Sequence, residues 1–177
     1  MQRVPLADFE PALKKRIEDL WGRPINLYRV LGNHPALACA WTEYAQSIRA
    51  DTRTPRALRE LMILRSGQVQ HSEYEWAQHL GMARKAGVRE AQIAALATWR
   101  DSREFDARER AALGLLEGVT AGKLDGATWA VAAEAFSREE LMELVLVAAF
   151  YSMVARVLDA LRVPLDEDIR DYAPPLG

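Results

Sequence analysis

Apolar residues recur along most of this chain at the three- and four-residue spacing of one helix face. Two-residue alternation and β-branched runs, which are typical of strands, are scarce, while Ala, Leu, Glu and Arg are frequent. The pattern therefore predicts an all-α protein. Helices are expected over residues 9–20, 26–31, 35–49, from 55 to a break within 68–71, 72–86, 89–98, 106–120, 127–136 and 141–161.

Several helix ends carry recognisable capping residues. Thr54 followed by Pro55 is expected to cap and begin the fourth helix, and Asn26 is expected to cap the short second one. Gly87 follows two basic residues, as a helix C-terminus favours. Two later helices are expected to begin with capping boxes, Asp106–Glu109 and Ser137–Glu140.

The length of 177 residues suits one domain with a sizeable core, so a single domain is expected over residues 1–177. The segments Leu58–Leu64 and Leu141–Val147 have similar sequences, which indicates that similar helices build both halves of the chain. The tail after Val163 is rich in Asp and Pro. We expect it to be loosely packed or to lie in a subunit contact.

Charge and composition exclude several classes of partner. The net charge of −2 gives no basic surface, so nucleic acid is not an expected partner. No apolar run is expected to cross a membrane, and the N-terminus lacks the apolar stretch of a signal peptide, so a cytoplasmic location is expected. Cys39 is the single cysteine, which excludes an intrachain disulfide.

The segment from Ser72 to His79 combines apolar and ionisable residues in one helical stripe. Ser72, Glu75, Trp76 and His79 share a face, because residues three, four and seven positions apart lie on the same side of a helix. Charged groups are costly to bury without partners. The polar members of the stripe therefore either satisfy one another in a pocket or lie in an interface.

His79 is the strongest candidate for proton transfer, since imidazole titrates near neutral pH. Glu75 lies one helical turn before it, and Glu60 on the preceding helix is expected to reach the same pocket. Two carboxyl groups beside one imidazole would divide acid and base roles. The alternative is that Glu75 and His79 form an ordinary solvent-exposed pair.

Other residues of the segment have a structural and a functional interpretation. Ser72 is either the N-cap of its helix or a hydrogen-bond donor to substrate. Direct activation of Ser72 by His79 is not expected, because two helical turns separate them by about 10 Å. Tyr74 either stabilises an oxyanion or packs its ring, and Trp76 either lines a pocket or fills the core.

On the last helix, Tyr151 and Arg156 are further substrate-binding candidates. Arg156 would either bind a substrate carboxylate or pair with an acid such as Glu60. The three histidines do not have the spacing of a metal site, and no metal is expected.

Glu60, Ser72, Glu75 and His79 resemble the active-site signature of the carboxymuconolactone decarboxylase and alkyl hydroperoxidase D (AhpD) superfamily. In its peroxidase branch a Glu is followed, after eleven residues, by Cys-x-x-Cys-x-x-x-His, and the spacing here is unbroken. The resemblance covers roughly residues 24–163. It implies an AhpD-like helical fold that forms an obligate homo-oligomer (dimer, trimer or hexamer).

The two cysteine positions of that signature hold Ser72 and Glu75, which cannot supply the thiolate pair of a peroxidase. The decarboxylase branch instead carries a Glu four residues before the His, as Glu75 stands here, and uses no metal or organic cofactor. The resemblance therefore implies a cofactor-independent acid/base enzyme that acts on a small carboxylated lactone or carbonyl compound.

In that interpretation His79 is the general acid or base, and Glu75 and Glu60 orient it and relay protons. Ser72 and Tyr74 would hydrogen-bond substrate oxygen, with Arg156 as a carboxylate anchor. One alternative is a non-catalytic oligomeric binding protein that kept the fold. A peroxidase is less favoured, since it would need Cys39 of a neighbouring chain in the pocket.

Overall fold

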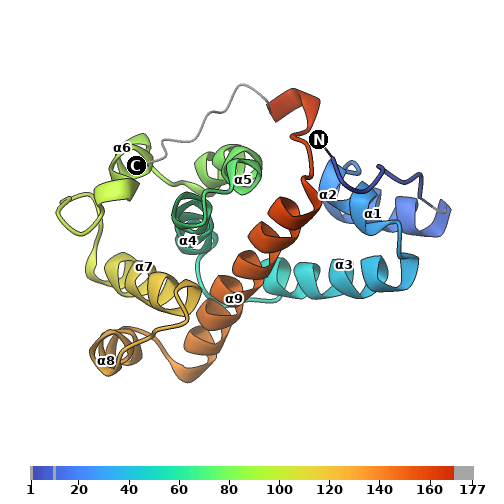
Figure 1. Ribbon diagram of the computed structural model, residues 1–177. Coiled ribbons are helices and arrows are strands. Elements are labelled where there is room, and N and C mark those ends of the chain that lie inside the picture. Colours follow the sequence, from blue (N-terminus) through green and yellow to red (C-terminus); the bar gives the residue numbers. More distant parts are fainter. Residues whose placement is uncertain (1, 10, 170–177) are drawn as a thin grey trace.

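The computed structural model describes residues 2–9 and 11–169, which form helices, turns and loops and contain no strand. The prediction of an all-α protein is confirmed (Figure 1). The α-helices are α1 (Pro11–Trp21), α2 (Asn26–Leu31), α3 (Pro35–Ala50), α4 (Arg56–Val69), α5 (Glu73–Ala86), α6 (Glu90–Ala95), α7 (Ala107–Thr120), α8 (Gly126–Ala135) and α9 (Arg138–Leu161). Two 3₁₀ helices are η1 (Leu96–Thr98) and η2 (Glu167–Ile169).

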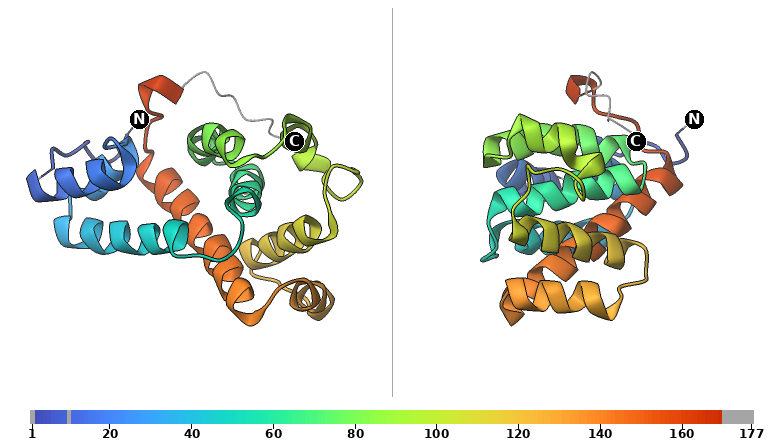
Figure 2. Two further views of the ribbon diagram at one scale, coloured as in Figure 1. Left: turned by 180° about the vertical axis from the view of Figure 1, so that it is seen from behind. Right: turned by 90° about the vertical axis from the view of Figure 1, so that its left-hand side faces the viewer.

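Helix α9 crosses the molecule diagonally between two groups of helices (Figure 1). Helices α1 to α3 lie on one side of α9, and α4 to α8 lie on the other. On that second side, α5, α4, α7 and α8 follow one another, each packing against the next (Figure 2). Apolar residues of α9, including Leu144, Val147 and Val154, are buried among them. The helix is thus the shared wall of both groups.

The length of α9 corrects one expectation. Its 24 residues make it long and apolar enough, by length and composition, to cross a membrane, although no such run was expected. In the structure, 56% of its most apolar window is buried inside the protein. A buried core helix passes the same test of length and composition, so the apolar sequence of α9 is accounted for by its central position.

Helices α4 and α5 form a tightly packed antiparallel pair, and this pair positions the candidate site. The turn between them is closed by a hydrogen bond from the backbone N–H of Ser72 to the carbonyl of Gly67 (2.8 Å). A side chain at Gly67 would meet the backbone nitrogen of Trp76 at 3.3 Å. Gly67 therefore permits the close approach of the two helices.

Most predicted caps are confirmed. Ser72 caps α5 by accepting a hydrogen bond from the Glu75 N–H, and Gly87 ends this helix in a left-handed conformation (φ 97°). Both capping boxes form at the expected helix starts, Asp106–Glu109 before α7 and Ser137–Glu140 before α9.

Two predicted caps are wrong, and in both cases a distant carboxylate binds backbone N–H groups near the start of the helix. The backbone N–H groups of Arg53 and Thr54 bind the carboxylate of Glu143 on α9, and α4 begins one residue later than expected, after Pro55. Asn26 lies inside the first turn of α2, and its backbone N–H donates to Asp166.

The expectation of a loose tail is wrong for its first part. Residues 164–169 pack against α2 and α5, and Asp166 and Ile169 are buried. The remainder of the tail, residues 170–177, lies outside the described residues.

Candidate functional site

A cavity of about 440 Å³ lies between α2, α3, α5, α9 and the segment around η2. This volume is in the range of small-molecule sites. Residues that line it include Glu75, Gln78, His79 and Met82 from α5, Tyr28 from α2, Trp41 and Arg49 from α3, Phe150 and Tyr151 from α9, and Asp168 and Ile169 from η2.

His79 is held against Glu60, which lies behind it on α4. The Nδ1 atom of His79 is 2.8 Å from Oε2 of Glu60, and the Glu60 side chain is fully buried. The second oxygen of Glu60 accepts a hydrogen bond from Arg56, one turn earlier on α4. Burial by itself raises the pKa of Glu60, but His79 and Arg56 outweigh it and hold this pKa below its ordinary value.

This arrangement fixes the orientation of the imidazole. An ionised carboxylate can only accept hydrogen bonds, so the Nδ1 atom of His79 carries the hydrogen that Glu60 accepts. In the neutral ring, the lone pair is then on Nε2, which lies 3.9 Å from Oε2 of Glu75. His79 therefore presents a proton-accepting atom toward Glu75 and the cavity.

Glu75 is buried on α5, and its Oε2 atom has no hydrogen-bond partner among the described residues. Burial raises the pKa of Glu75 to about 7, with the nearby Glu60 adding to the rise and His79 and Arg49 opposing it. The interpretation of Glu75 and His79 as a solvent-exposed pair is wrong, because both side chains are buried. Near neutral pH a part of the Glu75 carboxyl groups therefore keeps a proton that can be donated into the cavity, close to the Nε2 atom of His79.

Aromatic rings form a continuous wall from the outer part of the cavity to His79. Trp41 and Phe150 lie 5.4 Å apart between ring centroids, and Phe150 contacts Tyr151 at the same distance with perpendicular rings. Tyr151 in turn meets the imidazole of His79 edge to face at 5.0 Å. Burial raises the pKa of Tyr151, so its hydroxyl keeps its proton.

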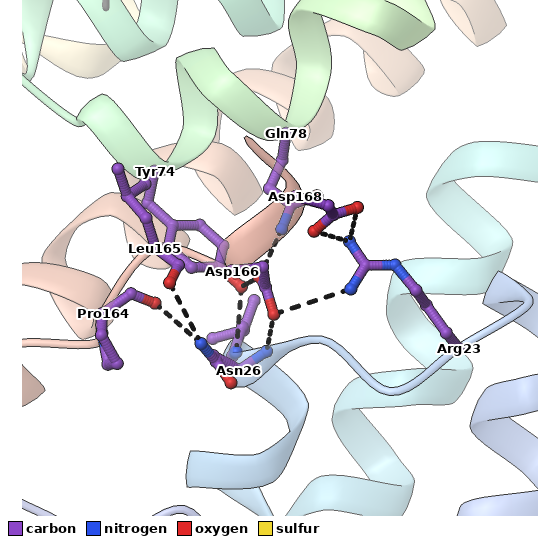
Figure 3. Close-up of polar contacts among 9 residues, drawn as sticks. Arg23, Asn26, Tyr74, Gln78, Pro164, Leu165, Asp166 and Asp168 are labelled. Carbon is purple, nitrogen blue, oxygen red and sulfur yellow. Dashed lines mark hydrogen bonds and ion pairs between the residues drawn. The ribbon is translucent and has the colours of Figure 1, made fainter. Parts of the chain in front are cut away.

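The segment around η2 is fastened over the cavity by Asp166 (Figure 3). One oxygen of Asp166 accepts hydrogen bonds from the Tyr74 hydroxyl (2.7 Å) and the Gln78 amide (2.6 Å), and the other accepts from the Asn26 N–H (2.9 Å). Two residues later, Asp168 accepts two hydrogen bonds from Arg23. These contacts hold Asp168 and Ile169 against the cavity.

The structure brings together five of the eight residues predicted from sequence. Glu75, His79, Tyr74 and Tyr151 line the cavity, and Glu60 supports His79 from behind. The Tyr74 hydroxyl donates its hydrogen to Asp166 and accepts one from the Leu27 N–H, so both of its functions are used within the protein.

The other three predicted residues lie elsewhere. Ser72 is the N-cap of α5 and does not line this cavity, and the ring of Trp76 is buried in the core between α4 and α7. Arg156 is exposed and bonds the Ser152 carbonyl and the Gln70 side chain. The suggested pairing of Arg156 with Glu60 is wrong, since Arg56 occupies that position.

Sequence reasoning missed Arg56, Arg49 and Asp166. Arg56 carried a usable signal, because a basic residue four positions before Glu60 shares its helix face. Arg49 and Asp166 carried none, because tertiary packing alone brings them to the cavity. Within the part of the chain that the structure describes, no group of three or more His, Cys, Asp or Glu residues is placed to hold a metal ion.

Solved structures with the same fold include a variant of the debrominase Bmp8 in complex with 2,3,4-tribromopyrrole, with 20% identity and a TM-score of 0.78. That match covers 90% of this chain and 87% of the debrominase. An uncharacterised peroxidase-related protein from Ralstonia eutropha JMP134, described as an alkylhydroperoxidase AhpD core, is 17% identical with a TM-score of 0.80, covering 95% and 94% of the two chains. One from Silicibacter sp. TM1040 is 15% identical with a TM-score of 0.81, covering 97% and 95%.

Fold and site together define an AhpD-like helical protein with a buried Glu–His–Glu cluster. Residues 35–118, which include this cluster, match the Carboxymuconolactone decarboxylase family. The chain is therefore similar to the carboxymuconolactone decarboxylase family over residues 35–118 and has the AhpD-like helical fold. No curated protein matches the chain closely enough to count as a relative.

Proposed function

We propose that this protein is a cofactor-independent acid/base enzyme, similar to carboxymuconolactone decarboxylase, that acts on a small carboxylated lactone or carbonyl compound. The observation that carries the proposal is the unpartnered, buried Oε2 atom of Glu75, which lines the cavity 3.9 Å from Nε2 of His79. A buried polar atom without a partner is unfavourable, and a substrate group placed there would satisfy it.

In this mechanism His79 and Glu75 are the catalytic residues. In a decarboxylation the C–C bond to the substrate carboxylate breaks, carbon dioxide leaves with an enolate remaining, and the carboxyl group of Glu75 donates its proton to the enolate carbon; in an isomerisation Nε2 of His79 accepts the proton next to the carbonyl and the enolate is protonated again. Glu60, kept ionised by Arg56 and His79, is a positioning residue that stabilises the imidazolium. The proposal gives no role in the chemistry to Ser72, Trp76 or Arg156, and Cys39 lies on the exposed surface of α3, so peroxidase chemistry gains no support.

The proposal is tested with a panel of small β-keto acids and enol lactones, including benzoylacetate and α-angelica lactone. Proton NMR in D₂O follows both deuterium uptake and loss of carbon dioxide. Glu75→Gln and His79→Gln are each expected to lower the enzymatic rate by about 10²-fold or more, as for loss of a general acid or base. Glu73→Gln is the matched control, because Glu73 is exposed in the first turn of the same helix.

Wild-type protein and the Glu73→Gln variant should therefore react at equal rates. Wild-type rates in the folded Glu75→Gln and His79→Gln variants would contradict the proposal. No reaction above background with any panel member, in a protein that nevertheless binds them, would favour the alternative of a non-catalytic binding protein.

A further inference from the structure

The segment after α9 passes over the cavity. Residues 164–169 run from the end of α9 past α2 to α5, and they include the short helix η2. Two of them, Asp168 and Ile169, lie in the cavity wall. Figure 3 shows the contacts that hold this segment, which we call the strap, against α2 and α5.

The near end of the strap is fixed to the core of the protein. Leu165 packs against the apolar cluster that α2, α3, α4, α5 and α9 share. The side-chain amide of Asn26 donates hydrogen bonds to the carbonyls of Pro164 and Leu165, at 3.2 and 3.3 Å. Movement of the strap would therefore pivot about this end.

The far end of the strap has weaker contacts of its own. Asp168 pairs with Arg23, but 58% and 44% of these two side chains are exposed. Ion pairs at such exposed positions contribute little to stability. Ile169 is buried and adds apolar contact. The position of the far end therefore depends on Asp166, which lies between the two ends.

Asp166 connects the strap to two helices at once. Its buried carboxylate accepts hydrogen bonds from Tyr74 and Gln78 on α5 and from the backbone N–H of Asn26 on α2. The nearest guanidinium nitrogen of Arg23 is 3.9 Å away. Hydrogen bonds to a carboxylate are strong, yet water can replace these donors when the carboxylate leaves them. The attachment is thus specific and reversible.

We propose that the strap is a gate: its far end moves away from α5 when Asp166 releases its donors, admits a small molecule to the cavity, and then closes over it. The inference goes beyond the proposed function, because it concerns entry and holds for any molecule that the cavity admits. Tyr74 and Gln78 alternate along α5 with Glu75 and His79. A closed strap would therefore keep water away from the same stretch of helix that carries the candidate acid and base.

The test is the access of iodoacetamide to a thiol placed behind the strap. Ala45 on α3 is buried and lines the cavity, so Ala45→Cys in a Cys39→Ser background supplies the reporter. Mass spectrometry follows its alkylation. With the strap intact, we expect the reporter to react about tenfold or more slowly than the exposed Cys39 of the wild-type protein, because it reacts only when the gate opens.

Release of the strap should speed up this reaction. Asp166→Asn replaces an accepting oxygen by a donor, so it cannot satisfy both α5 and α2, and we expect about tenfold faster alkylation of the reporter. Asp159→Asn is the matched control. Asp159 is exposed at the end of α9, pairs with Arg162 and does not line this cavity, so the reporter should react at its original rate.

A second reporter separates opening of the gate from unfolding of the protein. Ala112 is fully buried on α7, in the apolar cluster that includes α4 and α9 residues and is remote from the strap in Figure 1. A thiol introduced there by Ala112→Cys, also in the Cys39→Ser background, is expected to react only through unfolding. Asp166→Asn should therefore accelerate the Ala45→Cys reporter much more than the Ala112→Cys reporter.

Three results would overturn the proposal. The first is an Ala45→Cys reporter that reacts as fast as Cys39 with the strap intact. The second is a reporter rate that Asp166→Asn leaves unchanged, or that Asp159→Asn raises equally. The third is equal acceleration of both reporters.

If Asp166→Asn does not fold, Gln78→Leu replaces it, because it removes one donor and keeps a side chain of similar size. About threefold faster alkylation of the Ala45→Cys reporter, as for loss of one hydrogen bond, would then support the gate. An unchanged rate would overturn it.

Discussion

Glu75 occupies a position in which neither of its protonation states is fully satisfied. Its ionised form is disfavoured by burial and by Glu60, and its neutral form leaves a polar oxygen without a partner. Such groups cluster at functional sites, because a shifted pKa and an unfilled hydrogen-bonding position are both useful for catalysis. Glu60, on the facing helix, has the opposite shift because two cationic or proton-donating partners surround it.

The raised pKa of Glu75 predicts a pH-dependent stability. A carboxyl group with a folded pKa of about 7, against 4.5 in a model peptide, binds more protons in the folded than in the unfolded state. The wild-type protein should therefore lose stability as the pH rises from about 5 to 8. The Glu75→Gln variant has no carboxyl group at this position, so it should not show this decrease in stability. Between pH 5 and 8, we expect the free energy of unfolding of wild type to fall by roughly 2–3 kcal/mol relative to that of Glu75→Gln.

Urea denaturation at a series of pH values measures the difference. The Glu73→Gln variant makes the same chemical change at an exposed position, and its curve should follow that of wild type. If the curves of Glu75→Gln and wild type ran parallel, Glu75 would have an ordinary pKa.

At the scale of elements, the site depends on how closely α4 approaches α5. Glu60 and His79 are 19 residues apart in sequence and meet only because the turn between Gly67 and Ser72 brings the helices into contact. Asp166 then fixes the other face of α5 to the segment around η2 (Figure 3). The functional face of α5 is thus held from two sides.

Gly67→Ala is expected to destabilise the protein by about 1–3 kcal/mol and to lower turnover, because the new methyl group meets the α5 backbone rather than a mobile side chain. Gly114→Ala, inside α7, is the control. The nearest atom to its methyl group is a side-chain carbon of Thr128 at 3.6 Å, an ordinary contact. We expect Gly114→Ala to be neutral or to stabilise the helix by up to about 1 kcal/mol.

Thermal unfolding and the deuterium-uptake assay together measure both effects. A Gly67→Ala variant that unfolded and reacted like Gly114→Ala would show that the approach of α4 to α5 does not control the site.

At the scale of the whole molecule, the helices and most caps were predictable because they depend on local sequence. The capping boxes before α7 and α9 could be predicted because each is formed by two residues only three positions apart in the sequence. The Glu60, Glu75 and His79 positions were predictable from spacing that resembles a known signature. The wrong predictions concern the caps at Asn26 and Thr54 and the partner of Glu60. Tertiary packing brings distant carboxylates to Asn26 and Thr54, and a nearer arginine, Arg56, pairs with Glu60.

The long apolar helix illustrates the same limit. Burial of α9 between two groups of helices could not be read from its composition alone. The face of α9 that carries Met142, Leu146 and Met153 is exposed in the single chain. The expected homo-oligomer stays a prediction, and this face is a place where such contacts would bury apolar surface.

The central claim is that Glu75 is a proton donor facing the cavity, and the carboxyl resonances of the protein labelled with ¹³C at the glutamate side chains test it most directly. We expect one resonance to titrate with a midpoint near pH 7, to be absent in Glu75→Gln and to move when benzoylacetate is added. If every glutamate titrated near or below its ordinary value of 4.5, the assignment of Glu75 as the acid of this site would be contradicted.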